Sequence, residues 1–325
     1  MPDVSVIIPV FKVERFIERC AVSLMGQTLQ DVEFIFVDDA SPDDSIVILN
    51  EVLKKYPGRN VRIVTHELNR GLPAARNTGL SHATGEYIYH CDSDDWVEND
   101  MLEKMYESAK RNDADIVYCD FFISFEKNER YMHNPSYSTG DELMKRGFLG
   151  GMTKYNVWNK LVRRSIYTEN GILFPAGHGM GEDMTMIQVA AVSDKVVHVP
   201  EALYHYVKLN TEAFSNTNSV RHLEDIKFNM DRTISFLEAK YGDALERELA
   251  FFKLSNKLPC LVTGDKEQFK LWRSLYPEAN KYVMANKDVP LRTRLLQWMA
   301  AHNFWIGVKT YYLMVYKVIY GIIYR

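Results

Sequence analysis

Residues 4–10 read Val-Ser-Val-Ile-Ile-Pro-Val, and this stretch decides the fold. Its nearly continuous β-branched content is typical of a strand buried on both faces, and Pro9 stands where the strand ends and pairing is no longer needed. Between residues 4 and 123, short apolar runs alternate with amphipathic stretches. This alternation predicts an α/β fold, with a mostly parallel sheet whose strands are joined by flanking crossover helices.

Three further strands and the loops after them are expected in the same region. The strands are residues 32–37, 61–65 and 87–91, and a helix should run from about residue 13 to 25. Ligands of open parallel sheets bind beyond the carboxyl ends of the strands, so the loops that follow the strands should converge on one site. These loops are residues 9–12, 38–44, 69–76 and 92–95.

The composition narrows the class of protein. A chain of 325 residues with 46% hydrophobic and 25% charged residues is typical of a folded protein with one large or two modest domains. The net charge of -4 argues against a partner that is a nucleic acid. Four cysteines without a CxxC pair indicate neither a zinc knuckle nor a disulfide framework. The first residues lead directly into a strand, so we expect a cytoplasmic protein.

The most informative motif is residues 85–96, Gly-Glu-Tyr-Ile-Tyr-His-Cys-Asp-Ser-Asp-Asp-Trp. A buried strand here delivers three carboxylates, Asp92, Asp94 and Asp95, into one loop. A hard divalent cation, Mg²⁺ or Mn²⁺, would neutralise them and leave coordination positions for two phosphates. The alternative is an acidic cap for the helix that should begin near Met101.

Two more motifs stand at the ends of expected strands. Asp38 and Asp39 could accept hydrogen bonds from a base and a ribose, or they could serve turn chemistry alone. Residues 69–79, Asn-Arg-Gly-Leu-Pro-Ala-Ala-Arg-Asn-Thr-Gly, open a helix with glycine for close approach and with Arg76 for phosphate or base contacts. Taken alone, this run could also be a capped surface helix.

The order of these motifs resembles family 2 glycosyltransferases. Members have a strand that ends in proline and an aromatic residue, a strand ending Asp-Asp-x-Ser, an Asn-x-Gly-x-x-x-Ala-Arg-Asn-x-Gly helix and an Asp-x-Asp-Asp motif. All four occur here within residues 3–100. The resemblance implies a GT-A type fold, the nucleotide-diphospho-sugar transferase fold, with a helical C-terminal extension. It also implies a metal-dependent inverting enzyme with a nucleotide-sugar donor, expected to be a UDP-sugar.

The resemblance also carries over the donor-binding and metal-binding positions. Phe11 stands where members commonly have a tyrosine that stacks on uracil, and a ring face is enough for stacking. Asp92 and Asp94 would hold the metal ion. The donor-binding positions are Pro9, Val10, Phe11, Asp38, Asp39, Asn69, Gly71, Arg76, Asp92, Ser93 and Asp94.

A second part of the match lies on the acceptor side and extends to about residue 207. Residues 157–161, Val-Trp-Asn-Lys-Leu, and the later Gly181-Glu182-Asp183 resemble the family's pattern. There the resemblance assigns Asp183 as the catalytic base and Glu182 as a supporting or acceptor-binding neighbour; the alternative is a helix cap. Inversion needs only one carboxylate to take the proton of the acceptor hydroxyl. His205 is either a further metal ligand or a structural residue among aromatic side chains.

The last part of the chain differs from the rest. We expect a catalytic domain at residues 1–215, with nucleotide-sugar binding in 1–100 and the acceptor side in 101–215, and a helical region at 216–325. After Asp288 the chain has basic and aromatic residues but no acidic ones. An amphipathic helix over 292–325 could therefore lie on an anionic membrane surface, or it could pack on the catalytic domain or in a homodimer.

These expectations combine into one function with two alternatives. The main hypothesis is transfer of a sugar to a saccharide or lipid-linked glycan in the synthesis of bacterial capsule, O-antigen or exopolysaccharide, at the inner face of the cell membrane. The first alternative is a catalytically silent protein of the same fold that binds nucleotide sugars or glycans. The second, a sugar nucleotidyltransferase, lacks the glycine-rich loop expected after the first strand, where this chain has Phe-Lys-Val-Glu at 11–14.

Overall fold

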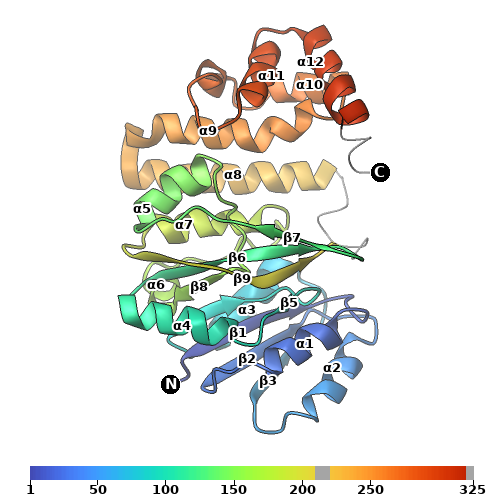
Figure 1. The fold of residues 1–325 in the computed structure, drawn as a ribbon, viewed down its shortest axis with the longest axis vertical. Helices are drawn as coiled ribbons and strands as arrows, with labels where there is room; N and C mark the ends of the chain where they lie inside the picture. Colours follow the sequence, from blue (N-terminus) through green and yellow to red (C-terminus); the bar gives the residue numbers. More distant parts are fainter. Residues whose placement is uncertain (209–219, 320–325) are drawn as a thin grey trace. The chain divides into compact units, whose positions relative to one another are not determined.

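The computed structural model describes residues 1–208 and 220–319 (Figure 1). By its contacts the chain divides into two compact units. The N-terminal unit comprises residues 1–144 and 155–236, and the C-terminal unit comprises 145–154 and 237–325.

In the described part of the chain, nine strands form one sheet in the N-terminal unit. The order is β3-β2-β1-β4-β8-β6-β9-β5, and β7 pairs with β6 outside this path. In chain order the strands are β1 (Val4–Val10), β2 (Val32–Asp38), β3 (Asn60–Thr65), β4 (Tyr87–His90), β5 (Trp96–Val97), β6 (Ile116–Ser124), β7 (Glu129–Met132), β8 (Lys160–Arg163) and β9 (Val196–Val207).

The first four strands confirm the parallel arrangement expected from the sequence. β1 lies between β2 and β4, and Val4 is opposite both Val32 and Tyr87. β2 pairs in parallel with β3 on its other side. Every residue of β1 is buried, as its continuous apolar run predicts.

Beyond β4 the sheet is mixed rather than mostly parallel. β8 runs antiparallel to both β4 and β6, whereas β9 is parallel to β6 and antiparallel to β5. A parallel neighbour needs a crossover connection, usually helical. β8 follows the short helical segment at 140–149 and the non-helical residues 150–159, and it enters the sheet in the opposite direction.

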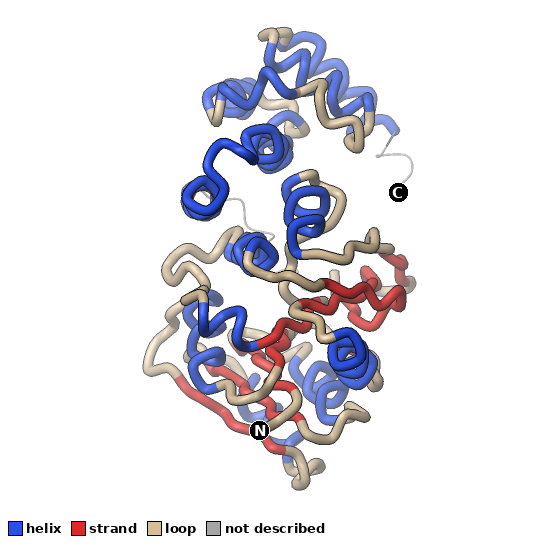
Figure 2. The backbone as a smooth tube through the Cα atoms, turned by 90° about the vertical axis from the view of Figure 1, so that its left-hand side faces the viewer, coloured by secondary structure: helices blue, strands red, loops and turns tan. Residues whose placement is uncertain are grey.

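Helices cover both faces of this sheet (Figure 2). Helices α1 and α4 share a core with alternate residues of β1, including Val4, Val6 and Ile8. Helix α3 lies on the opposite face, where Gly79 approaches Ile7. The helices of this unit are α1 (Ile17–Met25), α2 (Ser45–Leu53), α3 (Leu72–His82), α4 (Met101–Asn112), α5 (Gly140–Glu142), α6 (Arg164–Glu169), α7 (Thr185–Ala191) and the first part of α8 (Val220–Tyr241).

Helix α8 carries the N-terminal unit past residue 215, where the sequence places the boundary. Asn229 Nδ2 donates to the carbonyl oxygens of His178 and Met180 at 3.2 and 3.0 Å. Arg232 Nη2 donates to the carbonyl oxygen of Leu173 at 2.6 Å. These contacts with a distant segment leave no mark on the local composition, so the sequence gives no sign of them.

The C-terminal unit is helical, as expected. Its core includes Phe269 and Trp272, against which Leu296, Ala300 and Val308 pack. Its helices, after the end of α8, are α9 (Glu246–Lys257), α10 (Lys266–Ser274), α11 (Leu291–Ala301) and α12 (Trp305–Tyr311).

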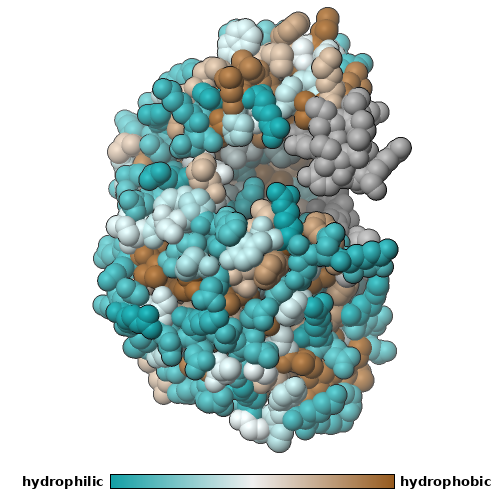
Figure 3. All heavy atoms as spheres, viewed as in Figure 1, coloured by the Kyte–Doolittle hydropathy of each residue, from teal (hydrophilic) through white to brown (hydrophobic). Residues whose placement is uncertain are grey.

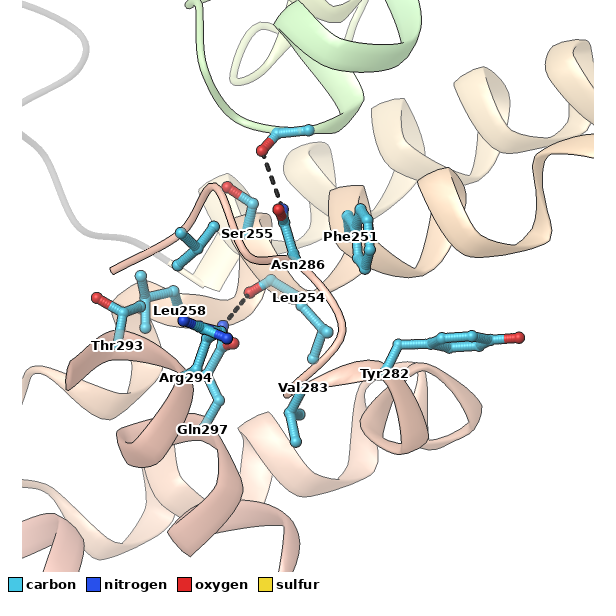
Figure 4. A pocket seen from close by; sticks show the side chains of 12 residues that line it. Phe251, Leu254, Ser255, Leu258, Tyr282, Val283, Asn286, Thr293, Arg294 and Gln297 are labelled. Atoms are coloured by element: carbon cyan, nitrogen blue, oxygen red, sulfur yellow. Dashed lines mark hydrogen bonds between the residues drawn. The ribbon is translucent and has the colours of Figure 1, made fainter. Parts of the chain in front are cut away.

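Two amides tie separate segments of this unit together (Figure 4). Asn286 Nδ2 donates to the carbonyl oxygen of Gly150 at 3.1 Å, which joins residues 145–154 to the helices. Gln297 Nε2 donates to the carbonyl oxygen of Leu254 at 3.0 Å, which joins α11 to α9. The small pocket beside these bonds contains none of the site residues expected from the sequence.

The single helix expected over residues 292–325 is wrong in one respect. The chain breaks between α11 and α12, where Asn303 has a left-handed φ of 59°. A π-helical turn over Tyr312–Ile319 follows α12, and residues 320–325 lie outside the described part of the chain. Within the described residues, no helix is long and apolar enough to cross a membrane.

Candidate active site

The ends of β1 and β2 place expected donor-side residues next to each other. Pro9 and Val10 at the end of β1 lie opposite Val37 and Asp38 of β2. Phe11 follows the strand and is 38% exposed. An exposed aromatic ring at this edge of a parallel sheet is in the position where such folds bind ligands.

Asp39 is buried, with an exposed fraction of 3%, so it does not lie on the surface where a sugar donor would contact it. Its carboxylate accepts hydrogen bonds from the backbone N–H groups of Arg70 and Gly71, each at 2.8 Å. Asp39 Oδ1 also lies 2.7 Å from His66 Nδ1. Asn69 Nδ2 donates to the carbonyl oxygen of Asp39 at 3.3 Å. Asp39 therefore holds the loop at 69–71 beside β2, and a direct contact with a donor stays a prediction. His66 was not among the site residues expected from the sequence. Its position directly after β3 is the feature that could have indicated it.

Helix α3 carries an arginine that is almost completely buried. Arg76 is 1% exposed, and its Cζ lies 5.5 Å from the ring centroid of Phe174. One turn later, Gly79 lets the helix lie against β1, since a Cβ there would be 2.2 Å from Ile7 Cγ2. A buried guanidinium is costly unless acidic partners surround it.

Three carboxylates surround this guanidinium. Arg76 Nη2 donates to Asp92 Oδ1 at 3.0 Å, and Nη1 donates to Glu182 Oε1 at 2.8 Å and to Asp183 Oδ1 at 2.9 Å. One cation thus joins the acidic motif after β4 to the start of the helical segment at residue 182. The contact of Arg76 with a donor, expected from the sequence, stays a prediction.

The helix-cap alternative fits neither acidic motif. Helix α4 has Asp100 at its N-cap, eight residues after Asp92. The 3₁₀ turn at Glu182–Met184 has Gly181 at its N-cap, with no side-chain cap. Glu182 and Asp183 lie in the first turn of this segment without capping it, and together with Asp92 they have Arg76 as their partner.

Burial changes the protonation of the Glu182–Asp183 pair. Burial, together with the charge of Asp183, raises the pKa of Glu182 to about 8, although Arg76 opposes the change. Burial also raises the pKa of Asp183, and Arg76 and Lys160 oppose it. Neighbouring carboxylates do not both ionise readily. The raised pKa of Glu182 favours its protonated form near neutral pH, which leaves Asp183 as the candidate proton acceptor of the pair.

Lys160 is a second buried cation of this site. Its Nζ donates to the carbonyl oxygen of Asn156 at 2.6 Å and to Asn159 Oδ1 at 2.8 Å, and the residue is 1% exposed. Burial lowers the pKa of Lys160 to about 7, and the charge of Asp183 opposes this change. The sequence placed Lys160 in the acceptor-side pattern but gave it no role.

The three carboxylates of the motif after β4 differ in how deeply they are buried. Asp95 is 1% exposed. It accepts hydrogen bonds from the hydroxyl group of Tyr204 at 2.5 Å and from the backbone N–H of Val207 at 2.7 Å. Burial, and next the charges of Asp94 and Asp92, raise the pKa of Asp95. Asp95 therefore anchors the loop to β9, and Asp92 and Asp94 are the partly exposed carboxylates of the motif.

The donor set at this loop fits a divalent metal only in part. Among the described residues, no group of three or more His, Cys, Asp or Glu side chains could hold a metal ion. Asp92 and Asp94 offer carboxylate oxygens, which Mg²⁺ and Mn²⁺ prefer. Mg²⁺ is commonly bound by one or two carboxylates together with the phosphates of a substrate. The two aspartates therefore fit a metal ion whose remaining ligands come from a diphosphate.

His205 fits the structural alternative better than metal ligation. Its Nδ1 lies 2.9 Å from Glu129 Oε1 and its Nε2 lies 2.9 Å from Glu98 Oε1. Its ring stacks on Trp96, with centroids 3.4 Å apart, and on Phe122, with centroids 4.8 Å apart. A metal ligand needs one free ring nitrogen, whereas both nitrogens here have carboxylate partners.

Comparisons with known proteins identify the family of the chain. The Glycosyl transferase family 2 profile matches residues 5–184. The chain is 34% identical over 283 residues to the "Uncharacterized glycosyltransferase EpsJ" of Bacillus subtilis (strain 168), which covers 81% of this chain and 78% of that protein.

Two solved structures share the fold. The crystal structure of S. aureus TarS 1-349 in complex with UDP-GlcNAc has a TM-score of 0.73 at 19% identity and covers 98% of this chain and 92% of that chain. The mannosyltransferase PcManGT from Pyrobaculum calidifontis in complex with GDP-Man and Mn²⁺ has a TM-score of 0.53 at 17% identity, with coverages of 96% and 87%. These likenesses confirm the GT-A type fold.

Proposed function

The chain belongs to glycosyl transferase family 2, and we propose on this premise that it is an inverting transferase that moves a sugar from a UDP-sugar to a hydroxyl group of a glycan. The observation that carries the proposal is the contact of Arg76 with Asp92, Glu182 and Asp183. It brings the acidic motif of the donor side and the expected base into one cluster. A protein that only binds nucleotide sugars has no need of the expected base.

Asp183 acts as the general base in this proposal. It takes the proton of the acceptor hydroxyl while that oxygen bonds to the anomeric carbon, and the bond from this carbon to the diphosphate breaks. Its raised pKa makes it a better proton acceptor than an ordinary aspartate, as long as the carboxylate is ionised. Protonated Glu182 would contact the acceptor, and Arg76 would fix the orientation of both side chains.

The donor lies across the carboxyl ends of β1, β2 and β4. The uracil stacks on Phe11, Asp38 accepts hydrogen bonds from the nucleoside, and the loop at 69–71 approaches the phosphates. The choice of UDP is supported by the TarS structure of similar fold, which holds UDP-GlcNAc. A metal ion held by Asp92 and Asp94 would neutralise the negative charge that gathers on the departing diphosphate.

The acceptor is a saccharide or a lipid-linked glycan used for a bacterial surface polysaccharide. We place the reaction in the cytoplasm at the inner face of the cell membrane. The name of the relative EpsJ supports transfer of a sugar and leaves the acceptor open.

A panel of nucleotide sugars tests this function. Release of the nucleotide is measured with a glycan acceptor, with EDTA, and after Mn²⁺ or Mg²⁺ is added back. We expect UDP release with one or a few UDP-sugars, its loss in EDTA and its recovery with metal. NMR of the product should show an anomeric configuration opposite to that of the donor. Binding without release for every donor would favour the silent protein, and a retained configuration would contradict inversion.

A further inference from the structure

The two units carry opposite charge. The C-terminal unit has 17 Lys and Arg against eight Asp and Glu, a formal charge of +9. The N-terminal unit has 22 Lys and Arg against 35 Asp and Glu, a formal charge of -13. The two values add to the net charge of -4, which hides the difference. A unit with this excess of cations is attracted to anionic surfaces.

Helix α11 exposes apolar side chains along one of its faces. Leu291, Leu295 and Trp298 follow each other at spacings of four and three residues, and they are 54%, 44% and 41% exposed. Side chains at these spacings lie on one side of a helix. The buried positions of the same helix, Leu296 and Ala300, pack into the core of the unit.

The segment after α11 continues this pattern. Phe304 is 50% exposed and Ile306 is 71% exposed, and the nearby Lys309 is exposed as well. Figure 3 shows hydrophobic side chains gathered over the part of the molecule where Figure 1 labels α10 to α12. We call the exposed apolar, Lys and Arg residues from 291 to 314 the tail surface: Leu291, Arg292, Leu295, Trp298, Phe304, Ile306, Lys309, Leu313 and Met314.

We propose that the tail surface binds the headgroup region of an anionic lipid bilayer. Exposed leucine, isoleucine and tryptophan among cations suit the boundary between headgroups and acyl chains. No described helix can cross a membrane, so α11 and α12 lie in the plane of the surface. A symmetric contact between the tail surfaces of two copies fits less well, because two units of charge +9 repel each other. Nucleic acid would use the cations but leave the apolar side chains in water.

The fold decides which variants can test the proposal. A chain that ends near residue 290 would lose Leu296, Ala300 and Val308 from the core, so its failure to bind could reflect unfolding. Substitutions of exposed side chains avoid this difficulty. Trp298→Ser with Ile306→Ser removes apolar contact, and Arg292→Gln with Lys309→Gln removes two charges.

The experiment is flotation of the full-length protein with vesicles of phosphatidylcholine alone or with 30% phosphatidylglycerol. We expect binding to the anionic vesicles only, and weaker binding in 0.5 M NaCl. The charge variant should bind roughly 30-fold more weakly, from about 1 kcal/mol for each cation. The apolar variant should lose about tenfold or more. The readout does not depend on catalysis, so it stands or falls separately from the proposed function.

A matched control comes from the N-terminal unit. Val47 and Phe125 are 60% and 47% exposed, so Val47→Ser with Phe125→Ser removes a similar apolar area outside the tail surface. This variant should float like the unchanged protein, and circular dichroism should show that all variants are folded. Three results would overturn the proposal: no binding to anionic vesicles, an equal loss in the control, or a dimer in sedimentation that the tail substitutions dissociate.

Discussion

The cations to which we assign roles lie in opposite environments in the two units. The acid-rich N-terminal unit buries Arg76 and Lys160 beside carboxylates, and each of the two residues is 1% exposed. The C-terminal unit has more cations than acids, and it leaves Arg292 and Lys309 exposed to solvent. Buried charges fix the geometry of a few groups, whereas exposed charges act together on a large partner. The net charge of a chain therefore says less about its function than the burial of each charge.

The largest effect should come from the buried carboxylate that we assign as the base. Asp183→Asn should lower kcat by about 10³-fold, because the amide cannot take the proton of the acceptor hydroxyl. Binding of UDP, measured by calorimetry, should change little. Asp31→Asn, at an exposed position, is the matched control. Normal turnover of the Asp183 variant would show that another group is the base.

Arg76→Lys should have the next largest effect. A lysine keeps the charge but cannot make three bonds in the geometry of a guanidinium, so we expect kcat to fall about 10²-fold from misplaced carboxylates. The free energy of unfolding in urea should also fall, by about 2 kcal/mol. Arg62→Lys, an exposed position, should change neither quantity. An unchanged kcat would show that Arg76 does not contribute to catalysis.

Lys160→Met should change the pH dependence more than the maximal rate. The charge of Lys160 lowers the pKa of Asp183, so its removal raises that pKa. Because the base must be ionised, activity falls as the pH drops through this pKa, and the acidic limb of kcat/KM should move to higher pH by about one unit. Lys127→Met, an exposed position, is the control. An acidic limb of kcat/KM that stayed in place or moved to lower pH would contradict the role given to Lys160.

The smallest effect should come from the exposed cations. Arg292→Gln with Lys309→Gln should leave kcat/KM for a water-soluble acceptor within about twofold, since isolated surface substitutions have small effects. Steady-state kinetics of this variant check the contrast between the two units. A loss as large as that of Arg76→Lys would mean that the tail surface also takes part in catalysis.

The sequence predicted the elements of the donor side well. The strands at Val4–Val10 and Asn60–Thr65 agree with the expected ones within a residue, because continuous apolar runs bounded by polar loops are a local signal. The loops that follow β1 to β4 carry several of the expected positions, including Phe11, Asp39, Asn69 and Asp92, and their contacts with a donor stay a prediction.

The contacts between distant residues were beyond such local reasoning. Nothing near Arg76 in the sequence indicates that its partners include Glu182, which is 106 positions later. The burial that raises the pKa of Glu182 is likewise a property of the folded unit. The break at Asn303 was missed because the apolar and basic pattern continues on both sides of it.

The near contact of Gly79 with Ile7 sets a limit on how this enzyme can be altered. Helix α3 rests on β1 without room for a methyl group, and Arg76 lies one turn before that point on the same helix. A side chain at position 79 would lift the helix and carry the guanidinium with it. A search for active variants would then find this position closed to alanine, although it lies apart from every group that reacts.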